Sequence, residues 1–320
     1  MTTTAAVGKL GSGRPLGGLR PAAPGGWLRR GEPLALLLGL ATTLTALMPT
    51  RLRYALADLG GEGAYWLLRP RSRVAEENYL PFASPEAGAR ALTRRAFRNY
   101  ARTVMDFLVL EDLVRATSRS PALVESAPLR RALERHRSAI VVTPHFGNWD
   151  LGAAMTATVG RPVAAVADRF GPPAVDRRVR ATRARVGVAV ISSGPSSARE
   201  ALRALRNGEV LCLAADIDRS GTGVGVEFLG REVSFPAGPA TLSLHSDSPV
   251  IPGYVRRLGG GAHEARLLDP LPFPPPGTAQ ARVAALTQEI AGAFEGIIRR
   301  EPAQCFAFHH LPPPIRGGSR

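Results

Sequence analysis

The sequence predicts an α/β fold with a largely parallel central sheet flanked by helices, and with an N-terminal helical segment that associates with a membrane. Short apolar runs recur after residue 139, and segments with helical spacing separate them. This alternation is typical of parallel strands joined by helices. The membrane-associated segment is predicted by the run from Pro33 to Thr50, which contains no charged residue.

The N-terminal part of the chain predicts two different segments. Residues 1–26 are rich in Gly, Ala, Pro and Thr and predict a disordered leader. Residues 27–55 predict one apolar helix with arginines at both ends. Its uncharged run is shorter than the ~20 residues that usually span a bilayer. We therefore expect an interfacial or partly inserted helix whose arginines meet lipid phosphates, with a buried core helix as the alternative.

The main domain is predicted over residues 56–312, and residues 313–320 predict a loose tail. Up to residue 138 helical spacing dominates. One helix within it carries arginines opposite an apolar stripe, and those arginines suit either a solvated or a membrane-facing surface. The stripe consists of Leu92, Ala96, Tyr100, Val104 and Phe107.

Strands and helices then alternate. The expected strands are 140–143, 163–167, 188–191, 210–214, 250–254 and 265–268. The expected helices are 151–159, 172–186, 196–206, 239–245 and 279–300.

The formal net charge of +15 predicts an anionic partner. No zinc-ligand spacing, helix-turn-helix signature or RNP string is present, and aromatic residues make up only 6% of the chain. These observations argue against nucleic acid and favour an anionic membrane surface. Two distant cysteines, Cys212 and Cys305, do not suggest a disulfide framework, so a reducing cytoplasmic setting is expected.

The strongest chemical signal is the string His145-Phe146-Gly147-Asn148-Trp149-Asp150, which follows an apolar run and Pro144. A strand, a loop and the start of a helix would place His145 at the open end of the sheet. A neutral histidine oriented by Asp150 can act as a general base near neutral pH. The alternative is a structural histidine in a turn.

This string resembles the HX4D/E motif of the bacterial lysophospholipid acyltransferase superfamily, in the branch of lipid A lauroyl/myristoyl and phosphatidylinositol mannoside acyltransferases. The resemblance covers the chain from about Leu34 to about His310. It implies that His145 removes the proton of an acceptor hydroxyl while Asp150 fixes the imidazole. Acyl-CoA or acyl carrier protein would be the co-substrate, with no cofactor, no metal and no covalent acyl-enzyme.

The same resemblance implies substrate-binding residues. Arg169 ends a predicted strand and would meet a phosphate, and Arg183 precedes Gly187 at the spacing that the family shows. Asn148, within the motif, Asp218 and Arg219 complete this set. For Arg169 the alternative is an ordinary surface arginine.

A second carboxylate is expected downstream. The pair Asp216-Ile217-Asp218 suits a metal by charge, but neither a third ligand nor a phosphate loop accompanies it. Residues 223–230 resemble a family segment that carries an acidic residue near the acceptor. Glu227 is the candidate, with Asp218 as the fallback, because Gly225 occupies a position where relatives can carry Glu.

Two further segments resemble the family. The string from Pro236 to Ala240 opens a helix whose amides could hold an anion, with a plain turn as the alternative. Residues 302–310 resemble the family's closing strand but lack its two tryptophans, which leaves the acceptor open.

The resemblance implies a membrane enzyme on the cytoplasmic face of the plasma membrane, peripheral or monotopic. The arginine-rich composition suggests an actinobacterial type of genome, which favours a phosphatidylinositol mannoside as the glycolipid acceptor. The alternatives are a lipid A type acyltransferase and a non-catalytic basic membrane-binding protein of the same fold.

Overall fold

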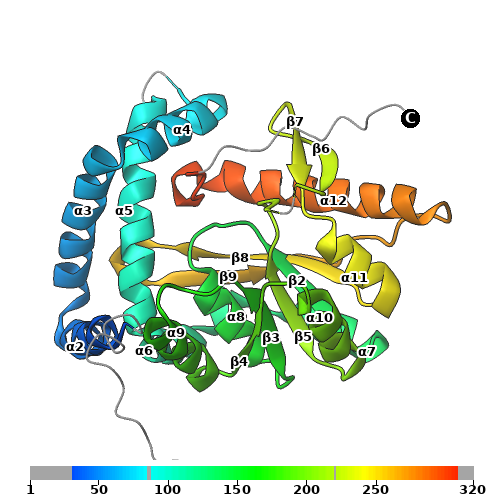
Figure 1. The fold of residues 1–320 in the computed structure, drawn as a ribbon, viewed down its shortest axis with the longest axis horizontal. Helices are drawn as coiled ribbons and strands as arrows, with labels where there is room; N and C mark the ends of the chain where they lie inside the picture. The colour runs from blue at the N-terminus through cyan, green and yellow to red at the C-terminus, as the bar shows by residue number, and fades with distance from the viewer. Residues whose placement is uncertain (1–30, 85–87, 220, 309–320) are drawn as a thin grey trace, which may run out of the picture.

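The computed structural model describes residues 31–84, 88–219 and 221–308 (Figure 1). The expected leader (1–26) and tail (313–320) lie outside the described residues, as do residues 27–30 of the expected apolar helix and His309 and His310. The remainder forms a mixed α/β structure around a seven-stranded sheet.

The central sheet is mostly parallel, as the sequence predicts. Its strand order is β1-β9-β8-β2-β5-β3-β4, and the five strands from β8 to β4 are parallel to one another. Strand β9 runs antiparallel to β8, and β1 is parallel to β9. The strands are β1 (Val124–Glu125), β2 (Ala139–Thr143), β3 (Val163–Ala167), β4 (Val188–Ser192), β5 (Val210–Ala214), β8 (Val250–Arg257) and β9 (His263–Leu267).

Helices cover both faces of the sheet. Ile140 and Val142 of β2 contribute to the core beneath α10, α11 and α12, whereas Ala139 and Val141 contribute to the core beneath α7 and α8. Successive strand residues point to opposite faces, so a strand buried on both sides is apolar throughout. These helices, with α9 beside them, are α7 (Ala127–Arg135), α8 (Trp149–Ala157), α9 (Pro173–Arg185), α10 (Ser197–Arg206), α11 (Gly238–Ser246) and α12 (Ala279–Arg300).

A helical layer stands beside one edge of the sheet, where α3 packs along α5 (Figure 1). Its helices are α2 (Glu32–Leu47), α3 (Thr50–Leu67), α4 (Arg69–Tyr79), α5 (Ala89–Leu108) and α6 (Leu110–Ser118). Among the described residues there are also four short 3-10 turns: η1 (Leu80–Phe82), η2 (Pro121–Leu123), η3 (Gly259–Gly261) and η4 (Pro302–Gln304).

The expected single helix over 27–55 is wrong, because the chain forms two helices there. Pro49 is extended and immediately precedes α3, and proline cannot continue a helix without loss of a hydrogen bond. Within the described part of the chain, no helix is both long and apolar enough to cross a membrane.

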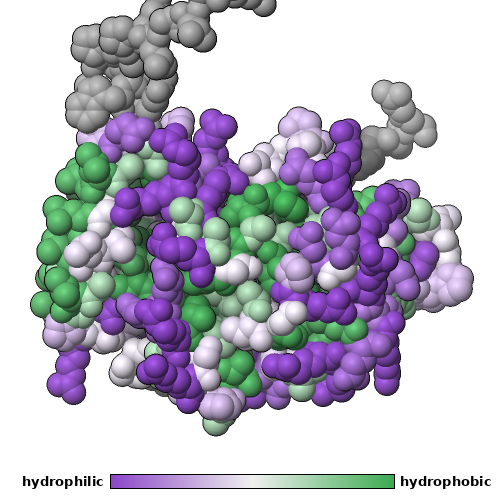
Figure 2. Space-filling model, turned by 90° about the horizontal axis from the view of Figure 1, so that it is seen from below, coloured by the Kyte–Doolittle hydropathy of each residue, from purple (hydrophilic) through white to green (hydrophobic). Residues whose placement is uncertain are grey.

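Exposed leucines nevertheless gather on α2 and α3, and Figure 2 shows an area of apolar side chains along this edge of the molecule. We call these residues the leucine face: Leu34, Leu36, Leu37, Leu40, Leu44, Leu47, Leu52, Leu56, Leu59 and Leu67.

The apolar stripe predicted for α5 is only partly right. Leu92 and Ala96 are buried, but Tyr100 and Val104 are exposed, at 39% and 49%. The polar residues Thr103 and Asp106 are buried instead, because Thr103 bonds to the Gly147 carbonyl and Asp106 bonds to the Arg257 guanidinium. Two arginines of α5 pair with carboxylates of α3, Arg94 with Glu62 and Arg102 with Asp58, and keep 43% and 30% of their side chains exposed.

A β-hairpin was not expected from the sequence. Strands β6 (Val224–Phe228) and β7 (Arg231–Phe235) pair in antiparallel fashion and pack on α12. Val226, Phe228 and Val233 face the main core, so the hairpin extends the domain.

Candidate active site

His145 lies in the loop between β2 and α8, at the carboxyl end of a central strand. This is the edge where open α/β sheets bind ligands. Gly147 has a φ of +58°, and a Cβ at this position would lie 1.7 Å from the carbonyl oxygen of Val255. The loop therefore runs against β8 so closely that only glycine fits.

The partner of His145 is Asp216, the second residue after β5. Nδ1 of His145 lies 2.6 Å from Oδ1 of Asp216, and the His145 backbone N–H donates to Oδ2 at 2.8 Å. Strands β2 and β5 are neighbours in the sheet, so both residues emerge at the same edge.

The pair has opposing electrostatic effects. Burial alone lowers the pKa of His145, but the charge and hydrogen bond of Asp216 outweigh it, so this pKa lies above its ordinary value. Burial raises the pKa of Asp216, but the charge and hydrogen bonds of His145 lower it by more than burial raises it, so the net shift is downward. An anionic Asp216 thus holds the Nδ1–H tautomer and leaves Nε2 for another group.

Asp150 does not orient His145 in this structure, contrary to expectation. Its Oδ1 accepts from Nε of Arg183 at 2.7 Å, and both side chains are largely buried, at 13% and 17% exposed. Asp150 lies in the first turn of α8, whose start turns it toward α9 instead. Arg183, expected to bind substrate, is consequently the partner of the motif's carboxylate.

Neither carboxylate expected downstream bonds to His145: Asp218 lines the groove beside it but is held by its own loop, and Glu227 lines a different pocket. Glu227 lies near the end of β6, where alternation buries Val226 and Phe228 and turns Glu227 outward, into a pocket with Arg231 and Gln288. Asp218 is buried and accepts from Ser234 Oγ at 2.6 Å and from the amides of Gly221 and Gly223. It organises its own loop.

The remaining expected residues divide into two groups. Asn148 is 1% exposed and caps α8 through a bond from the Leu151 N–H, so it is not available to a substrate here. Arg169 and Arg219 are exposed on the groove beside His145. Arg219 pairs with Asp168 at 2.9 Å.

Two grooves meet at His145 and share Trp149, Ile217 and Arg219. The first, here called the aromatic groove, runs between α3 and α5 and is lined by Gly61, Ala64, Leu68, Arg71, Phe97, Tyr100, Ala101, Phe306 and Phe308. The second, the polar groove, crosses the carboxyl ends of β3 and β5. Its polar residues include Asp150, Asp168, Arg169, Arg183, Ser193 and Ser197.

The polar groove also reaches Pro236, Ala237 and Gly238, where α11 begins. This is the helix start that the sequence singled out as an anion site.

The C-terminal segment closes over the histidine loop as a bridge and not as a regular strand. Cys305 pairs with Phe146, and the Phe306 N–H donates to the His145 carbonyl at 2.8 Å. The Phe306 ring lies edge-on to Trp149, with centroids 5.8 Å apart. Phenylalanines thus occupy the region for which the sequence lacks the expected tryptophans.

Asp216 is the residue that sequence reasoning missed as a partner of His145. The sequence did place it directly after a strand, in Asp216-Ile217-Asp218. What it did not reveal is that β5 lies beside β2, since β3 and β4 intervene along the chain.

The class of protein to which this α/β fold and its histidine loop belong is given by a family match, and that class is the acyltransferases. Residues 33–311 match the family described as bacterial lipid A biosynthesis acyltransferase, and the chain belongs to this family.

Its relatives include the phosphatidylinositol mannoside acyltransferase of Mycolicibacterium smegmatis, which is 27% identical over 285 residues. That match covers 80% of this chain and 90% of the relative. The phosphatidylinositol mannoside acyltransferase of Mycobacterium tuberculosis is 31% identical over 190 residues, covering 58% of this chain and 57% of the relative. The branch that the His145–Asp150 string resembles is confirmed.

Proposed function

We propose that this protein transfers a fatty acyl group from a thioester donor, acyl-CoA or acyl carrier protein, to a hydroxyl of a glycolipid. The favoured acceptor is a phosphatidylinositol mannoside, as in the names of its relatives. The observation that carries the proposal is the contact between His145 and Asp216 at the meeting point of two grooves.

His145 acts as the general base. Nε2 takes the proton of the acceptor hydroxyl while the hydroxyl oxygen attacks the thioester carbonyl. The tetrahedral intermediate then expels the thiolate, which recovers the proton from His145. Asp216 keeps the imidazole in the required tautomer and stabilises its charged form, the role first expected of Asp150. No metal, cofactor or acyl-enzyme is needed for these steps.

The two grooves suit the two substrates. The aromatic groove opens between α3 and α5, beside the leucine face, and its apolar lining suits lipid chains. The polar groove carries Arg169 and Arg219, which suit the phosphates of a donor or of a glycolipid headgroup. Arg169 or backbone amides stabilise the oxyanion.

The leucine face and the positive charge suit an anionic membrane. We infer peripheral or monotopic association with the cytoplasmic face of the plasma membrane, through leucines inserted at the interface and arginines at lipid phosphates. This location gives the protein direct access to a lipid acceptor.

Acyl transfer by purified protein tests the proposal. Radiolabelled palmitoyl-CoA is supplied with vesicles containing phosphatidylinositol mannosides, and the acylated lipid is identified by mass spectrometry. We expect transfer by the wild type and at least a ~100-fold loss in His145→Ala. Transfer that survives in His145→Ala would exclude His145 as the base.

A parallel assay with lipid A precursors examines the second candidate acceptor, which the description of the family favours. Transfer to these precursors alone would reassign the acceptor. Vesicle binding without transfer to either acceptor would leave a membrane-binding protein that retains only the fold.

A further inference from the structure

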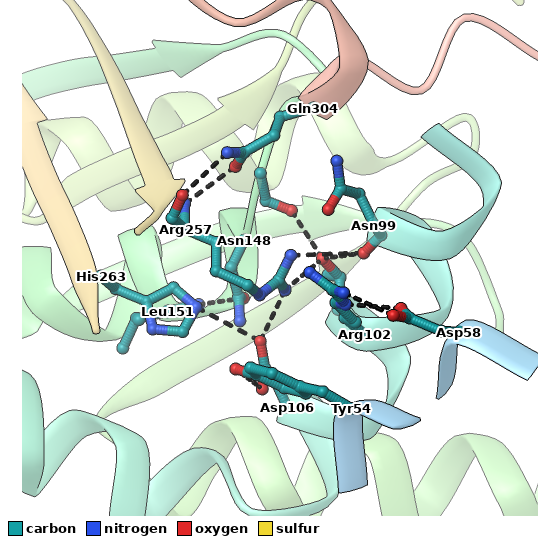
Figure 3. Close-up of polar contacts among 12 residues, drawn as sticks. Tyr54, Asp58, Asn99, Arg102, Asp106, Asn148, Leu151, Arg257, His263 and Gln304 are labelled. Carbon is teal, nitrogen blue, oxygen red and sulfur yellow. Dashed lines mark hydrogen bonds and ion pairs between the residues drawn. The ribbon is translucent and has the colours of Figure 1, made fainter. Parts of the chain in front are cut away.

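A buried charge cluster joins α5 to the end of β8, through Asp106 and Arg257 (Figure 3). Nη2 of Arg257 lies 2.6 Å from Oδ2 of Asp106, and both side chains are only 3% exposed. Nε2 of His263 lies 3.3 Å from the same oxygen, and the Tyr54 hydroxyl donates to Oδ1 at 2.9 Å. Desolvation makes a buried ion pair weak evidence for stability alone. The burial of the Arg257–Asp106 pair at this place therefore suggests a role other than stability.

Arg257 reaches the His145 loop through the Thr103 hydroxyl. Nη2 of Arg257 donates to Oγ1 of Thr103 at 3.0 Å. That hydroxyl has one proton to donate and lies 3.0 Å from the carbonyl oxygen of Gly147 and 3.1 Å from the carbonyl oxygen of Asn99. Arg257 and Thr103 are both buried. A hydroxyl that accepts from a guanidinium is polarised, which strengthens the bond that it donates.

A second route runs through Gln304. The Arg257 backbone N–H donates to Oε1 of Gln304 at 2.8 Å, and Nε2 of Gln304 donates to the Arg257 carbonyl at 2.9 Å. The Gln304 carbonyl in turn accepts from the Gly147 N–H at 2.8 Å. The Gly147 N–H thus bonds to Gln304 and the Gly147 carbonyl to Thr103, and both of these residues bond to Arg257.

Gly147 is two residues from His145, and the pairing of His145 depends on where this loop lies. The His145 backbone N–H and Nδ1 each bond to one oxygen of Asp216. A shift of the loop would change both bonds together.

We propose that Arg257, acting through Thr103 and Gln304, is a positioning residue for His145. The buried Arg257–Asp106 pair fixes the Gly147 peptide, and this fixes the geometry between His145 and Asp216. Its effect on rate rests on the proposed acyl transfer, whereas its effect on the His145–Asp216 contact does not.

The sharpest variants are Thr103→Val and Thr103→Ser, because valine keeps the shape of threonine and serine keeps the hydroxyl. We expect Thr103→Val to lower kcat by roughly 10- to 100-fold, since a small misplacement of a reacting group is costly. KM for both substrates should change little, and Thr103→Ser should recover most of kcat. A role confined to stability would lower Tm and leave the kcat of the folded enzyme unchanged.

Arg256 provides a matched control for Arg257. It is the preceding residue of β8, pairs with Glu264 at 2.9 Å and is 33% exposed. Arg257→Lys keeps one charge opposite Asp106 but cannot make the same set of bonds. We expect Arg257→Lys to lower kcat while Arg256→Lys does not.

The position of His145 can also be measured without turnover. In protein labelled with ¹³C-histidine, an NMR titration gives the pKa of His145, whose resonance is assigned by its absence in His145→Ala. Loss of contact with Asp216 in Thr103→Val should lower this pKa relative to the wild type, and Thr103→Ser should restore it.

The results separate the two hypotheses. An unchanged His145 pKa and an unchanged kcat in Thr103→Val would overturn the positioning role. If the pKa of His145 is lowered in Thr103→Val but the wild-type protein transfers no acyl group, the positioning role is supported and the proposed function is refuted.

Discussion

Asp216 and Asp150 have different partners in the site. Asp216 bonds twice to His145, whereas Asp150 bonds to Arg183. A general base works only when neutral, so the rate falls as pH drops through the pKa of His145. Because Asp216 raises that pKa above its ordinary value, the acidic limb of the pH–rate profile should lie correspondingly high.

Replacement of Asp216 by Asn should therefore change both rate and pH dependence. We expect Asp216→Asn to lower kcat/KM by about 100-fold or more, because the tautomer is no longer held. The acidic limb of its residual activity should move to lower pH, since the charge that raised the pKa of His145 is gone. Asp150→Asn should leave the limb where it is in the wild type. If the acidic limb of the pH–rate profile moves in Asp150→Asn and stays in place in Asp216→Asn, Asp150 and not Asp216 is the carboxylate that acts on His145.

Gly147 is the residue on which the loop geometry depends most directly. Gly147→Ala combines an unfavourable φ of +58° with a collision at the Val255 carbonyl, and should lower the free energy of unfolding by about 3 kcal/mol. Gly160→Ala is the control, because Gly160 has a φ of +89° and open space around its Cβ position. Urea denaturation should show a smaller loss for Gly160→Ala, about 1–2 kcal/mol. Only Gly147→Ala should also lose activity; equal losses of stability would mean that the collision is relieved.

At the scale of elements, the β6–β7 hairpin decides the part played by Glu227. This residue is exposed on the outer side of β6, in a polar pocket with Arg231, Glu232 and Gln288 that does not include His145. We expect Glu227→Gln to keep kcat and KM within about twofold of the wild type, as for an ordinary surface change. Steady-state kinetics with both substrates measure this, and a loss comparable to that of Asp216→Asn would place Glu227 in the reaction.

The sequence predicts elements well where one period dominates. The helix at 279–300 is predicted to the residue because its apolar residues follow the helical period over many turns, and the strand at 210–214 because it lies in a continuous apolar run with polar residues on both sides. The stripe of α5 was partly wrong because Thr103 and Asp106 are buried by partners 44 and 151 residues away. The hairpin was missed because Gly and Glu interrupt β6. Neighbouring strands cannot be read from chain order, which explains why Asp216 was not assigned to His145.

At the scale of the whole molecule, two features suit a membrane surface. The chain carries a formal net charge of +15, and the leucine face leaves Leu36 and Leu59 each 71% exposed. Apolar contact and attraction to anionic lipids respond differently to salt. Screening weakens attraction between exposed charges over a Debye length of about 10 Å at 0.1 M salt, whereas burial of leucine is little affected.

Sedimentation with vesicles should separate these two contributions. Binding to anionic vesicles should exceed binding to neutral vesicles at low salt, and the difference should shrink as salt rises. Leu36→Ser with Leu59→Ser should weaken binding to both kinds of vesicle at every salt concentration, by on the order of tenfold per leucine that becomes buried. Phe273→Ser is the control, because Phe273 is exposed in the segment before α12, away from the leucine face. Unchanged binding by the double leucine variant would mean that the membrane contacts another face.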